Sequence, residues 1–596
     1  MEQLKKRSEI RIEDTWNLAD MYETLEAWEL DYKRAERLLE ELALKKGSLR
    51  STLKSTLDLY YETLRLVDKI YVYAHQYSDQ DTANSIGQSI ARKAQNLSIE
   101  MGAKTSYLVP EILGLGETWL ENEIKSEPEL GYYKRIIKEM IRQNEHVRSA
   151  EIEEILADAA DLSNAPKDIY TFLSNADLRF GEISDENGNL VEITSGNLVL
   201  FLENKNRKTR AAAFQTFYKE LEQFKNTFAA AYYANVRQAI FFSKARHYHS
   251  TRAMYLDDAN IPEEVYDNLI ETTHKHLDTM YRYVKLRKQI LKVEELHMYD
   301  VYVPIVSEAK QHYTIEEAKQ LVLDALHVMG EEYTSILKQG FENRWIDVYP
   351  NEGKKSGAYS WGCYDSNPYV LLNFQGTLND VFTLAHEMGH SLHKYYSKQN
   401  QGFAYADYRI FVAEVASTCN EALLIRYLLE KTQDSKQKAY LLNHFLDKFK
   451  GTMFRQTMFA EFEKETHKLA ERKTPLTAEL LCQIYKELNE CYFGPDMIVD
   501  QEISMEWARI PHFYRPFYVY QYATGFAAAV ALSSRILKEG EHALEDYKKF
   551  LKGGSSMDPI DLLKIAGVDM TKPEPIEEAL NVFAALLGEL EQIVIG

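Results

Sequence analysis

The sequence predicts a mainly α-helical protein that is divided into at least two lobes and carries a small β-sheet. Its 596 residues exceed what one compact core usually organises. Proline and glycine are scarce, with 14 and 26 residues, and apolar residues recur at spacings of three and four along most of the chain. This spacing is typical of amphipathic helices, and residues 232–246 and 575–594 show it clearly.

Two segments break the helical spacing. Residues 179–195 contain an Asp-Glu-Asn-Gly turn between short alternating stretches, which predicts a β-hairpin. Residues 356–374 are rich in aromatic and β-branched residues and predict two short strands that lead directly into a helix. We therefore expect a helical N-terminal lobe over residues 1–200 and a larger helical part over residues 201–596 that holds the sheet.

Composition disfavours nucleic acid and membranes as partners. Acidic residues number 91 against 70 basic ones, so the net charge of −21 would repel a phosphate backbone. The best basic stripe, residues 205–210, is short, and we interpret it as a solvated helix start. No apolar run approaches the ~20 residues that span a bilayer.

The cysteines and the first residues predict a cytoplasmic protein. No apolar stretch follows the early basic residues, so no secretory signal is visible. Four scattered cysteines without C-x-x-C spacing suit a reducing compartment, and we expect core thiols at Cys363, Cys419, Cys482 and Cys491.

The strongest chemical signal is a pair of histidines four residues apart, His386 and His390. On a helix these side chains lie on one face, where one tetrahedral zinc ion can accept both. Glu387 then reaches the water at the metal rather than the metal itself. Thr377 and Asp380 predict the start of this helix through a capping box. The alternative is a surface helix that carries these residues without a metal.

We expect Glu414 to be the third protein ligand of the metal. His393 points partly away from His390, and a metzincin pattern would require glycine at 393 and histidine at 396, where the chain has tyrosine. A thermolysin-like spacing would require a glutamate near residues 409–410, where arginine and isoleucine stand. The next acidic residue along the chain is Glu414.

The surroundings of Glu414 support this expectation. It is a lone carboxylate in the apolar, small-residue run 410–417, and a buried carboxylate must meet a cation. The alternative cation is an arginine in the core. Glu421 lies two turns further along the same helical face, where it either orients a histidine ligand or has a structural role.

A third signal is the aromatic segment 512–525, which holds one histidine and four tyrosines within eleven residues. Amide hydrolysis builds negative charge on the carbonyl oxygen, and tyrosine hydroxyls or a histidine N–H can stabilise that charge. We expect at least two of the four tyrosines to belong to the core. The favoured donors are His512, Tyr518 and Tyr522.

Motifs from one end of the chain to the other resemble those of a known family. They are Thr15–Tyr22, Phe180–Gly188, Arg246–Ala253, Ser356–Trp361, Thr383–Ser391, Phe411–Thr418 and Tyr518–Gly525. Together they resemble oligoendopeptidase F, in the superfamily of thimet oligopeptidase and neurolysin. The resemblance implies zinc ligation by His386, His390 and Glu414, with Glu387 catalytic. It also implies two lobes around a deep substrate channel that admits short unstructured peptides. Cys419 replaces an aromatic residue that is common in related chains.

The sequence therefore predicts a zinc-dependent endopeptidase that binds one Zn²⁺ per chain and uses Glu387 as general base. Cobalt or manganese could use the same ligands. We expect the strand near residues 369–374 to pair with the substrate backbone. A dipeptidyl carboxypeptidase of the same chemistry and a non-catalytic peptide-binding protein are the alternatives, and the oligomeric state stays open.

Overall fold

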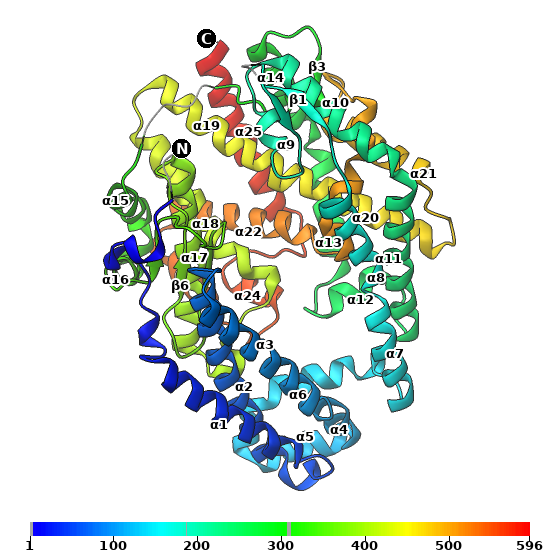
Figure 1. Cartoon of the computed structure of the whole chain (residues 1–596), viewed down its shortest axis with the longest axis vertical. Helices are drawn as coiled ribbons and strands as arrows, with labels where there is room; N and C mark the ends of the chain where they lie inside the picture. The colour runs from blue at the N-terminus through cyan, green and yellow to red at the C-terminus, as the bar shows by residue number, and fades with distance from the viewer. Residues whose placement is uncertain (1–3, 186–187, 307–311, 596) are drawn as a thin grey trace. The chain divides into compact units, whose positions relative to one another are not determined.

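The computed structural model describes residues 4–185, 188–306 and 312–595, and these residues are mainly helical with small sheets, as predicted (Figure 1). They form two compact units, each built from three stretches of the chain. Unit 1 comprises Met1–Val147, Gln311–Tyr427 and Leu532–Gly567, and unit 2 comprises Arg148–Lys310, Leu428–Ala531 and Val568–Gly596. The division of the sequence near residue 200 stays a prediction. No helix among the described residues is both long and apolar enough to cross a bilayer.

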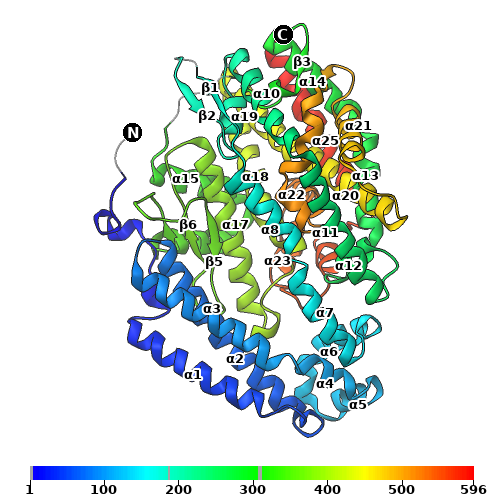
Figure 2. The same ribbon diagram turned by 45° about the vertical axis from the view of Figure 1, so that its right-hand side comes forward.

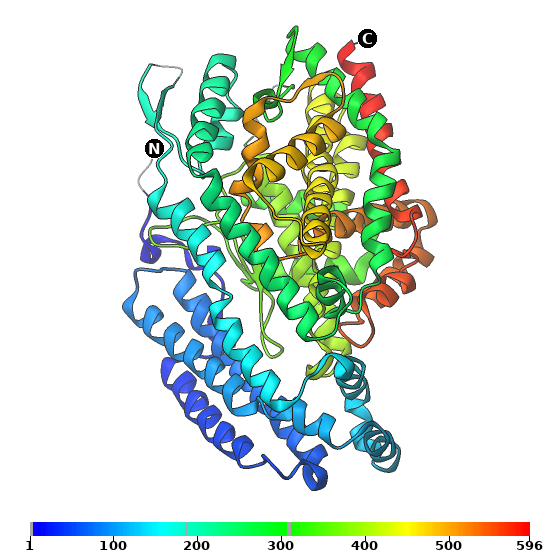
Figure 3. The same cartoon turned by 90° about the vertical axis from the view of Figure 1, so that its right-hand side faces the viewer.

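Unit 1 begins with three long helices that lie side by side (blue in Figure 3). Thr24 and Asn84 cap the first and third of them by accepting backbone N–H groups, as their residue types favour. The helices of this unit are α1 Leu25–Ala43, α2 Leu49–Asp79, α3 Ser85–Thr105, α4 Leu108–Gly114, α5 Glu117–Ser126, α6 Lys134–Arg142, α15 Ile315–Ala325, α16 Gly330–Glu342, α17 Leu378–Asn400, α18 Ile410–Lys431, α23 Glu541–Leu551 and α24 Pro559–Ile565. Helix α18 ends within unit 2.

A three-stranded sheet lies beside α17 in this unit (Figure 2). Its strands are β4 Ile346–Asp347, β5 Tyr359–Trp361 and β6 Tyr369–Leu371, in the order β4-β6-β5. Strand β6 pairs in parallel with β4 and antiparallel with β5. The two strands predicted within residues 356–374 are therefore confirmed, and the third strand comes from the chain just before them.

The N-terminal motif packs on this sheet. The Trp16 ring lies 6.3 Å from the ring centroids of both Tyr359 and Tyr369, and the Tyr369 hydroxyl donates to the Asn17 carbonyl at 2.7 Å. Trp16 and Tyr22 are buried. The motif around Trp16 thus supports the sheet whose strand β5 lines the candidate site described below.

Unit 2 is an assembly of helices with two small sheets. The predicted hairpin is present as β1 Glu182–Ser184 and β2 Leu190–Glu192, although Glu186 and Asn187 of its turn lie outside the described residues. Strands β3 Leu296–His297 and β7 Met497–Ile498 pair in parallel. The helices are α7 Ala150–Leu162, α8 Ala165–Phe172, α9 Leu198–Leu202, α10 Arg207–Gln223, α11 Lys225–Ala245, α12 Thr251–Asp257, α13 Glu263–Lys275, α14 Leu277–Leu291, α19 Ser435–Phe449, α20 Arg455–Glu471, α21 Ala478–Phe493, α25 Glu574–Ile595 and α22 Tyr520–Glu539, the last of which ends in unit 1.

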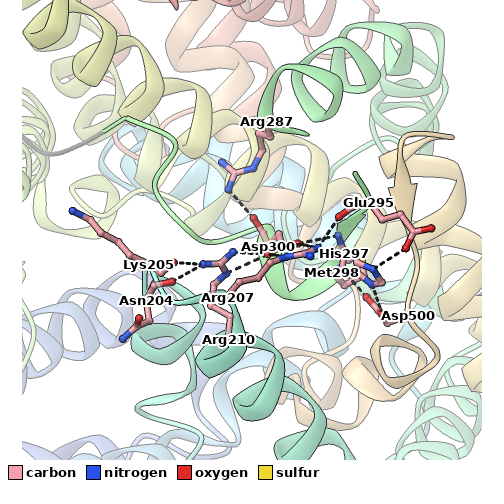
Figure 4. A network of polar contacts seen from close by, with 10 residues as sticks. All are labelled: Asn204, Lys205, Arg207, Arg210, Arg287, Glu295, His297, Met298, Asp300 and Asp500. Carbon is pink, nitrogen blue, oxygen red and sulfur yellow. Dashed lines mark hydrogen bonds and ion pairs between the residues drawn. The ribbon is translucent and has the colours of Figure 1, made fainter. Parts of the chain in front are cut away.

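The basic stripe at residues 205–210 has a role in the core of unit 2 (Figure 4). Asn206 caps α10, as the helix-start interpretation predicts. The solvated interpretation is wrong for Arg210, which is buried and donates to the Asp300 carboxylate at 2.6 Å. Arg207 donates to the same carboxylate at 2.9 Å. A buried carboxylate is costly without cations, and Asp300 is paired with two arginines of the stripe, the buried Arg210 and the partly exposed Arg207.

Candidate metal centre

The two histidines of the predicted metal site lie on one face of α17. Thr377 and Asp380 form the expected capping box at its start, and the apolar face that includes Val381, Leu384 and Met388 is buried. The ring centroids of His386 and His390 are 4.9 Å apart. The helical spacing of four residues therefore produces the side-by-side imidazoles that the sequence predicted.

Glu414 approaches both histidines from α18. Its Oε2 atom lies 3.3 Å from His386 Nε2 and 3.6 Å from His390 Nε2. One ligand atom from each of the three residues falls within 4.8 Å of the others, and this is the group among the described residues with a metal-binding arrangement. Its contacts within the described part of the chain are with these histidines and Ser417, not with an arginine.

The exposure of Glu414 differs from the expectation of a buried carboxylate. Its side chain is 37% exposed, although its neighbours Phe411, Val412 and Val415 are buried. The run 410–417 is apolar because most of its residues pack in the core, while Ala413 and Glu414 line the pocket. Glu414 is therefore not the buried carboxylate that we expected, but it does meet the histidines.

Gly389 allows α17 and α18 to approach closely. A Cβ atom on this residue would lie 2.5 Å from the Ser417 Cα and 2.8 Å from the Ala416 carbonyl oxygen. Both contacts are shorter than real Cβ atoms make, and both involve backbone. Any side chain at Gly389 would therefore push the helix that carries Glu414 away from the histidines.

Polar side chains hold the two helices in register. The Asn420 amide donates to the Ala385 carbonyl at 3.1 Å and accepts from the Tyr333 hydroxyl at 2.8 Å. Glu421 Oε1 lies 2.6 Å from His386 Nδ1, which confirms the contact that would orient a histidine ligand. A carboxylate accepts only, so Nδ1 carries a proton, and with a metal bound Nε2 would present its lone pair to the ion.

The electrostatics of the group match a cation site. Burial lowers the pKa of His386, but hydrogen bonds with Glu414 and Glu421 outweigh it and raise the pKa to about 10. Burial raises the pKa of Glu414, but the two histidines hold it well below its usual range. These carboxylates therefore create a strong preference for positive charge at the imidazoles, and a divalent cation can supply that charge in place of protons.

The donor set fits zinc. Two imidazole nitrogens and one carboxylate oxygen are ligands that Zn²⁺ accepts, and a catalytic zinc site has three protein ligands with a fourth position open. The fixed tautomer of His386 and the carboxylate on its far nitrogen are the outer arrangement that such sites use. His386, His390 and Glu414 are the residues that would hold the ion.

These residues line a pocket of about 470 Å³. Glu387 lines it as well and is only 7% exposed. Burial raises the pKa of Glu387, and the nearby histidines oppose this change. The carboxylate of Glu387 thus lies beside the metal ligands in a setting that strengthens it as a base.

The strand at the pocket is β5, not β6. Residues 358–362 line the pocket, whereas β6 is the central strand with partners on both sides and its three residues are buried. The expectation that the strand near residues 369–374 pairs with substrate is therefore wrong, because a central strand has no free edge. Val370 N donates to the Trp345 carbonyl, so the alternation of the ladder directs Ser360 N–H and C=O away from β6.

His393 lies on the same helix but has no part in the metal group. Its ring stacks on Tyr408 at 3.7 Å with an interplanar angle of 3°. Burial, assisted by His390 and Lys394, lowers its pKa to about 3. The exclusion of His393 as a ligand agrees with this geometry.

The structure brings His512, Tyr518 and Tyr522 together in unit 2. The Tyr522 hydroxyl lies 3.4 Å from His512 Nε2, and the rings of Tyr518 and Tyr522 are 5.4 Å apart at an angle of 89°. The other two tyrosines pack elsewhere: Tyr514 stacks on Tyr170, and Tyr520 lies against Tyr266. The expected division into core tyrosines and a separate cluster is present, while the catalytic role of the cluster stays a prediction.

Sequence reasoning missed the residues that connect the helices and the strand. Gly389 and Asn420 have no distinctive local pattern, although glycine inside a buried helix indicates close backbone packing. Ser391 hydrogen-bonds with Ser360 at 2.8 Å and thereby ties α17 to β5. Of the four expected core thiols, Cys363 and Cys419 are buried, whereas Cys482 and Cys491 are partly exposed.

Family comparisons cover nearly the whole chain. Residues 200–582 match the family described as Peptidase family M3, and residues 111–180 match Oligopeptidase F. Oligopeptidase PepF of Bacillus subtilis is 48% identical over 99% of this chain and 89% of its own length. Group B oligopeptidase PepB of Streptococcus agalactiae is 40% identical over 99% of this chain and 98% of its own.

Solved structures agree with the same fold. A crystal structure from Chlamydophila abortus is similar with a TM-score of 0.93 and 35% identity, covering 99% of this chain and 100% of that one. Oligoendopeptidase-F from Enterococcus faecium has a TM-score of 0.76 and 39% identity, covering 95% of this chain and 98% of that one.

Proposed function

Because the chain belongs to peptidase family M3, we propose that this peptidase is a zinc-dependent endopeptidase that hydrolyses internal bonds of short, unstructured peptides. The observation that carries the proposal is the convergence of His386, His390 and Glu414 beside Glu387 in one pocket. Family relatives that are named oligopeptidases support the class of substrate.

A bound Zn²⁺ would lower the pKa of a water in the pocket and polarise the scissile carbonyl. Glu387 takes a proton from the attacking water as its oxygen bonds to the carbonyl carbon. The C–N bond then breaks, and Glu387 returns the proton to the leaving nitrogen, so that the carboxylate is restored. Its raised pKa, caused by burial, suits both halves of this exchange.

The free edge of β5 is the proposed backbone-recognition element. Ser360 N–H and C=O face away from β6, and residues 358–362 line the pocket. An extended peptide that pairs with this edge is held through its main chain, which allows many sequences to bind. Ser391 keeps the strand fixed to the helix that carries Glu387.

We assign His512, Tyr518 and Tyr522 as hydrogen-bond donors to the carbonyl oxygen on which negative charge develops. The mutual contacts of the three side chains support this assignment, because they gather two hydroxyls and an imidazole in one cluster.

The alternative function is a dipeptidyl carboxypeptidase of the same chemistry, and Lys394 is the residue that supports it. It lines the pocket and forms an ion pair with the exposed Asp407. A lysine at this position could capture a terminal carboxylate. A peptide with an amidated C-terminus separates the two activities, because an endopeptidase cuts it normally and a carboxypeptidase does not.

The deciding experiment is cleavage of an internally quenched peptide by the wild type, metal-stripped protein and Glu387→Gln. We expect stripping to abolish activity and Zn²⁺ to restore it. Glu387→Gln should bind metal normally but lose roughly 10²- to 10⁴-fold in kcat, the usual contribution of a general base. Glu352→Gln, at an exposed position of the same unit, is the control. Equal rates for Glu387→Gln and the wild type would refute the mechanism.

A further inference from the structure

A buried acid on α20 contacts the segment that carries the tyrosine cluster. Glu463 is completely buried, and its Oε1 accepts the backbone N–H of Phe517 at 3.0 Å. Phe517 has a φ of 54°, in the left-handed region that non-glycine residues avoid. Its ring lies against Tyr266 and His467. The bond from Glu463 therefore stabilises a strained residue immediately before Tyr518.

No cation among the described residues neutralises Glu463. Burial raises its pKa well above the usual range, and the Phe517 N–H opposes this only in part. Its second oxygen, Oε2, is buried and lacks a hydrogen-bond partner among the described residues. A buried carboxyl without a cation is protonated. Because Oε1 accepts from Phe517, the proton belongs on Oε2, where it makes a hydrogen-bond donor.

An acceptor without a partner lies one helical turn further along α20. The Thr251 hydroxyl donates its single proton to Glu471 Oε1 at 2.8 Å, so it must accept from His467 Nδ1 at 3.0 Å. This assigns the ring proton of His467 to Nδ1 and leaves Nε2 as an acceptor. Nε2 is also buried and lacks a partner among the described residues. Burial lowers the pKa of His467 to about 3, so the ring is neutral.

Glu463 and His467 are four residues apart and thus share one face of the helix. Glu463 Oε2 and His467 Nε2 do not hydrogen-bond to each other, and a charge on either buried group would be more costly than the neutral form. Thr251 belongs to the motif 246–253 that the sequence singled out. This motif therefore fixes the tautomer of the histidine whose ring packs against Phe517.

We propose that Glu463 is a positioning residue, a neutral acid that holds the backbone of Phe517 through Oε1, so that Tyr518 and Tyr522 are presented correctly. The inference rests on the proposed function for the role of the tyrosines. Glu463 itself does not touch substrate. Its carboxyl fixes the backbone from which the hydroxyls project.

The first test measures backbone hydrogen exchange in peptides that cover residues 513–522. Glu463→Leu should accelerate exchange there, because it removes the acceptor of the Phe517 N–H. Glu463→Gln should preserve protection, because its amide keeps a neutral acceptor and a donor of similar shape. Glu465→Leu, at a partly exposed position of the same helix, is the control. Unchanged exchange in Glu463→Leu, or equal acceleration in Glu463→Gln, would overturn the inference.

The second test is a double-mutant cycle on kcat. Glu463→Leu should lower kcat roughly tenfold, of the order expected for a lost hydrogen bond, with KM little changed. The loss should be much smaller in a Tyr518→Phe background, because both changes act on one group. Independent losses in the two backgrounds would overturn the positioning role. If Tyr518→Phe alone leaves kcat intact, the donor assignment fails, whereas the exchange experiment still judges the hold on Phe517.

Discussion

The candidate metal centre and the segment 512–522 both place histidine beside oxygen atoms. The two regions differ in how the fold holds these side chains in position. At the metal centre, two long helices carry the ligands, and Gly389 allows their backbones to touch. In the segment, the histidine lies on a short 3₁₀-helix, Pro511–Tyr514, and Tyr518 follows a strained residue. Regular helices define positions by local geometry, whereas an irregular segment needs specific buried contacts.

The same difference appears in the protonation of the histidines. Carboxylate partners overcome burial at His386 and raise its pKa to about 10. At His512, burial and then Arg515 lower the pKa. One site is prepared for positive charge and the other for neutral hydrogen bonding. Metal affinity is therefore the measurement that reports on the candidate metal centre, whereas kcat reports on the segment 512–522.

In the segment 512–522, the largest effect on turnover should come from Tyr518. Tyr518→Phe should lower kcat by roughly 10²- to 10³-fold if its hydroxyl stabilises the developing oxyanion, because one such donor contributes that much. Tyr514→Phe is the matched control, since Tyr514 stacks on Tyr170 outside the cluster. Steady-state kinetics with a quenched peptide measure both. Similar losses in the two variants would place the effect in packing rather than in donation.

Glu421→Gln tests whether the charge beside His386 contributes to metal affinity. The amide still reaches His386 Nδ1 but carries no charge, so we expect metal affinity to fall by roughly 10- to 100-fold. Competition with a chromophoric chelator measures the dissociation constant. An unchanged affinity would mean that Glu421 only packs between the helices.

Gly389→Ala tests whether helix contact sets the metal site. The new Cβ would meet the Ser417 backbone at 2.5 Å, and overpacking of this kind costs about 1–3 kcal/mol. We expect a lower unfolding midpoint together with weaker metal binding. Gly102→Ala, on α3 with open space around it, should be neutral or slightly stabilising. A lower unfolding midpoint with unchanged metal affinity would show that contact between the helices stabilises the fold but does not set the metal site.

His393 should make the stability of the metal-free protein sensitive to acid. Its folded-state pKa of about 3 lies below the unfolded value near 6.5, so the unfolded chain binds more protons between these values. Stability is therefore lost as pH falls from about 6.5 towards 3, by at most about 1.4 kcal/mol per pH unit. His393→Phe should lessen this loss and leave metal stoichiometry unchanged. Urea unfolding of metal-free protein at several pH values measures the slope, and identical slopes would contradict the burial of a neutral ring.

Much of the metal centre follows from local sequence. The spacing of His386 and His390, the cap at Thr377 and the strands within residues 356–374 depend on neighbours a few residues away. Helical period and capping chemistry act over one or two turns, so both can be predicted from the amino-acid sequence. The absence of the metzincin and thermolysin-like spacings pointed to Glu414 as the third ligand, and the resemblance of motifs to a known family supported it and added the class of peptidase.

Only the tertiary structure decided which distant segments meet. In the folded protein, β6 is the central strand of its sheet and Glu414 lies on a face that is open to the pocket. Arg210 is buried beside Asp300, and Glu463 accepts the backbone N–H of Phe517. Strand order and buried polar pairs depend on contacts between residues far apart in the chain, and no local period encodes them. The sequence by itself therefore determined the reactive groups on α17, and the tertiary structure decided the partners that orient them.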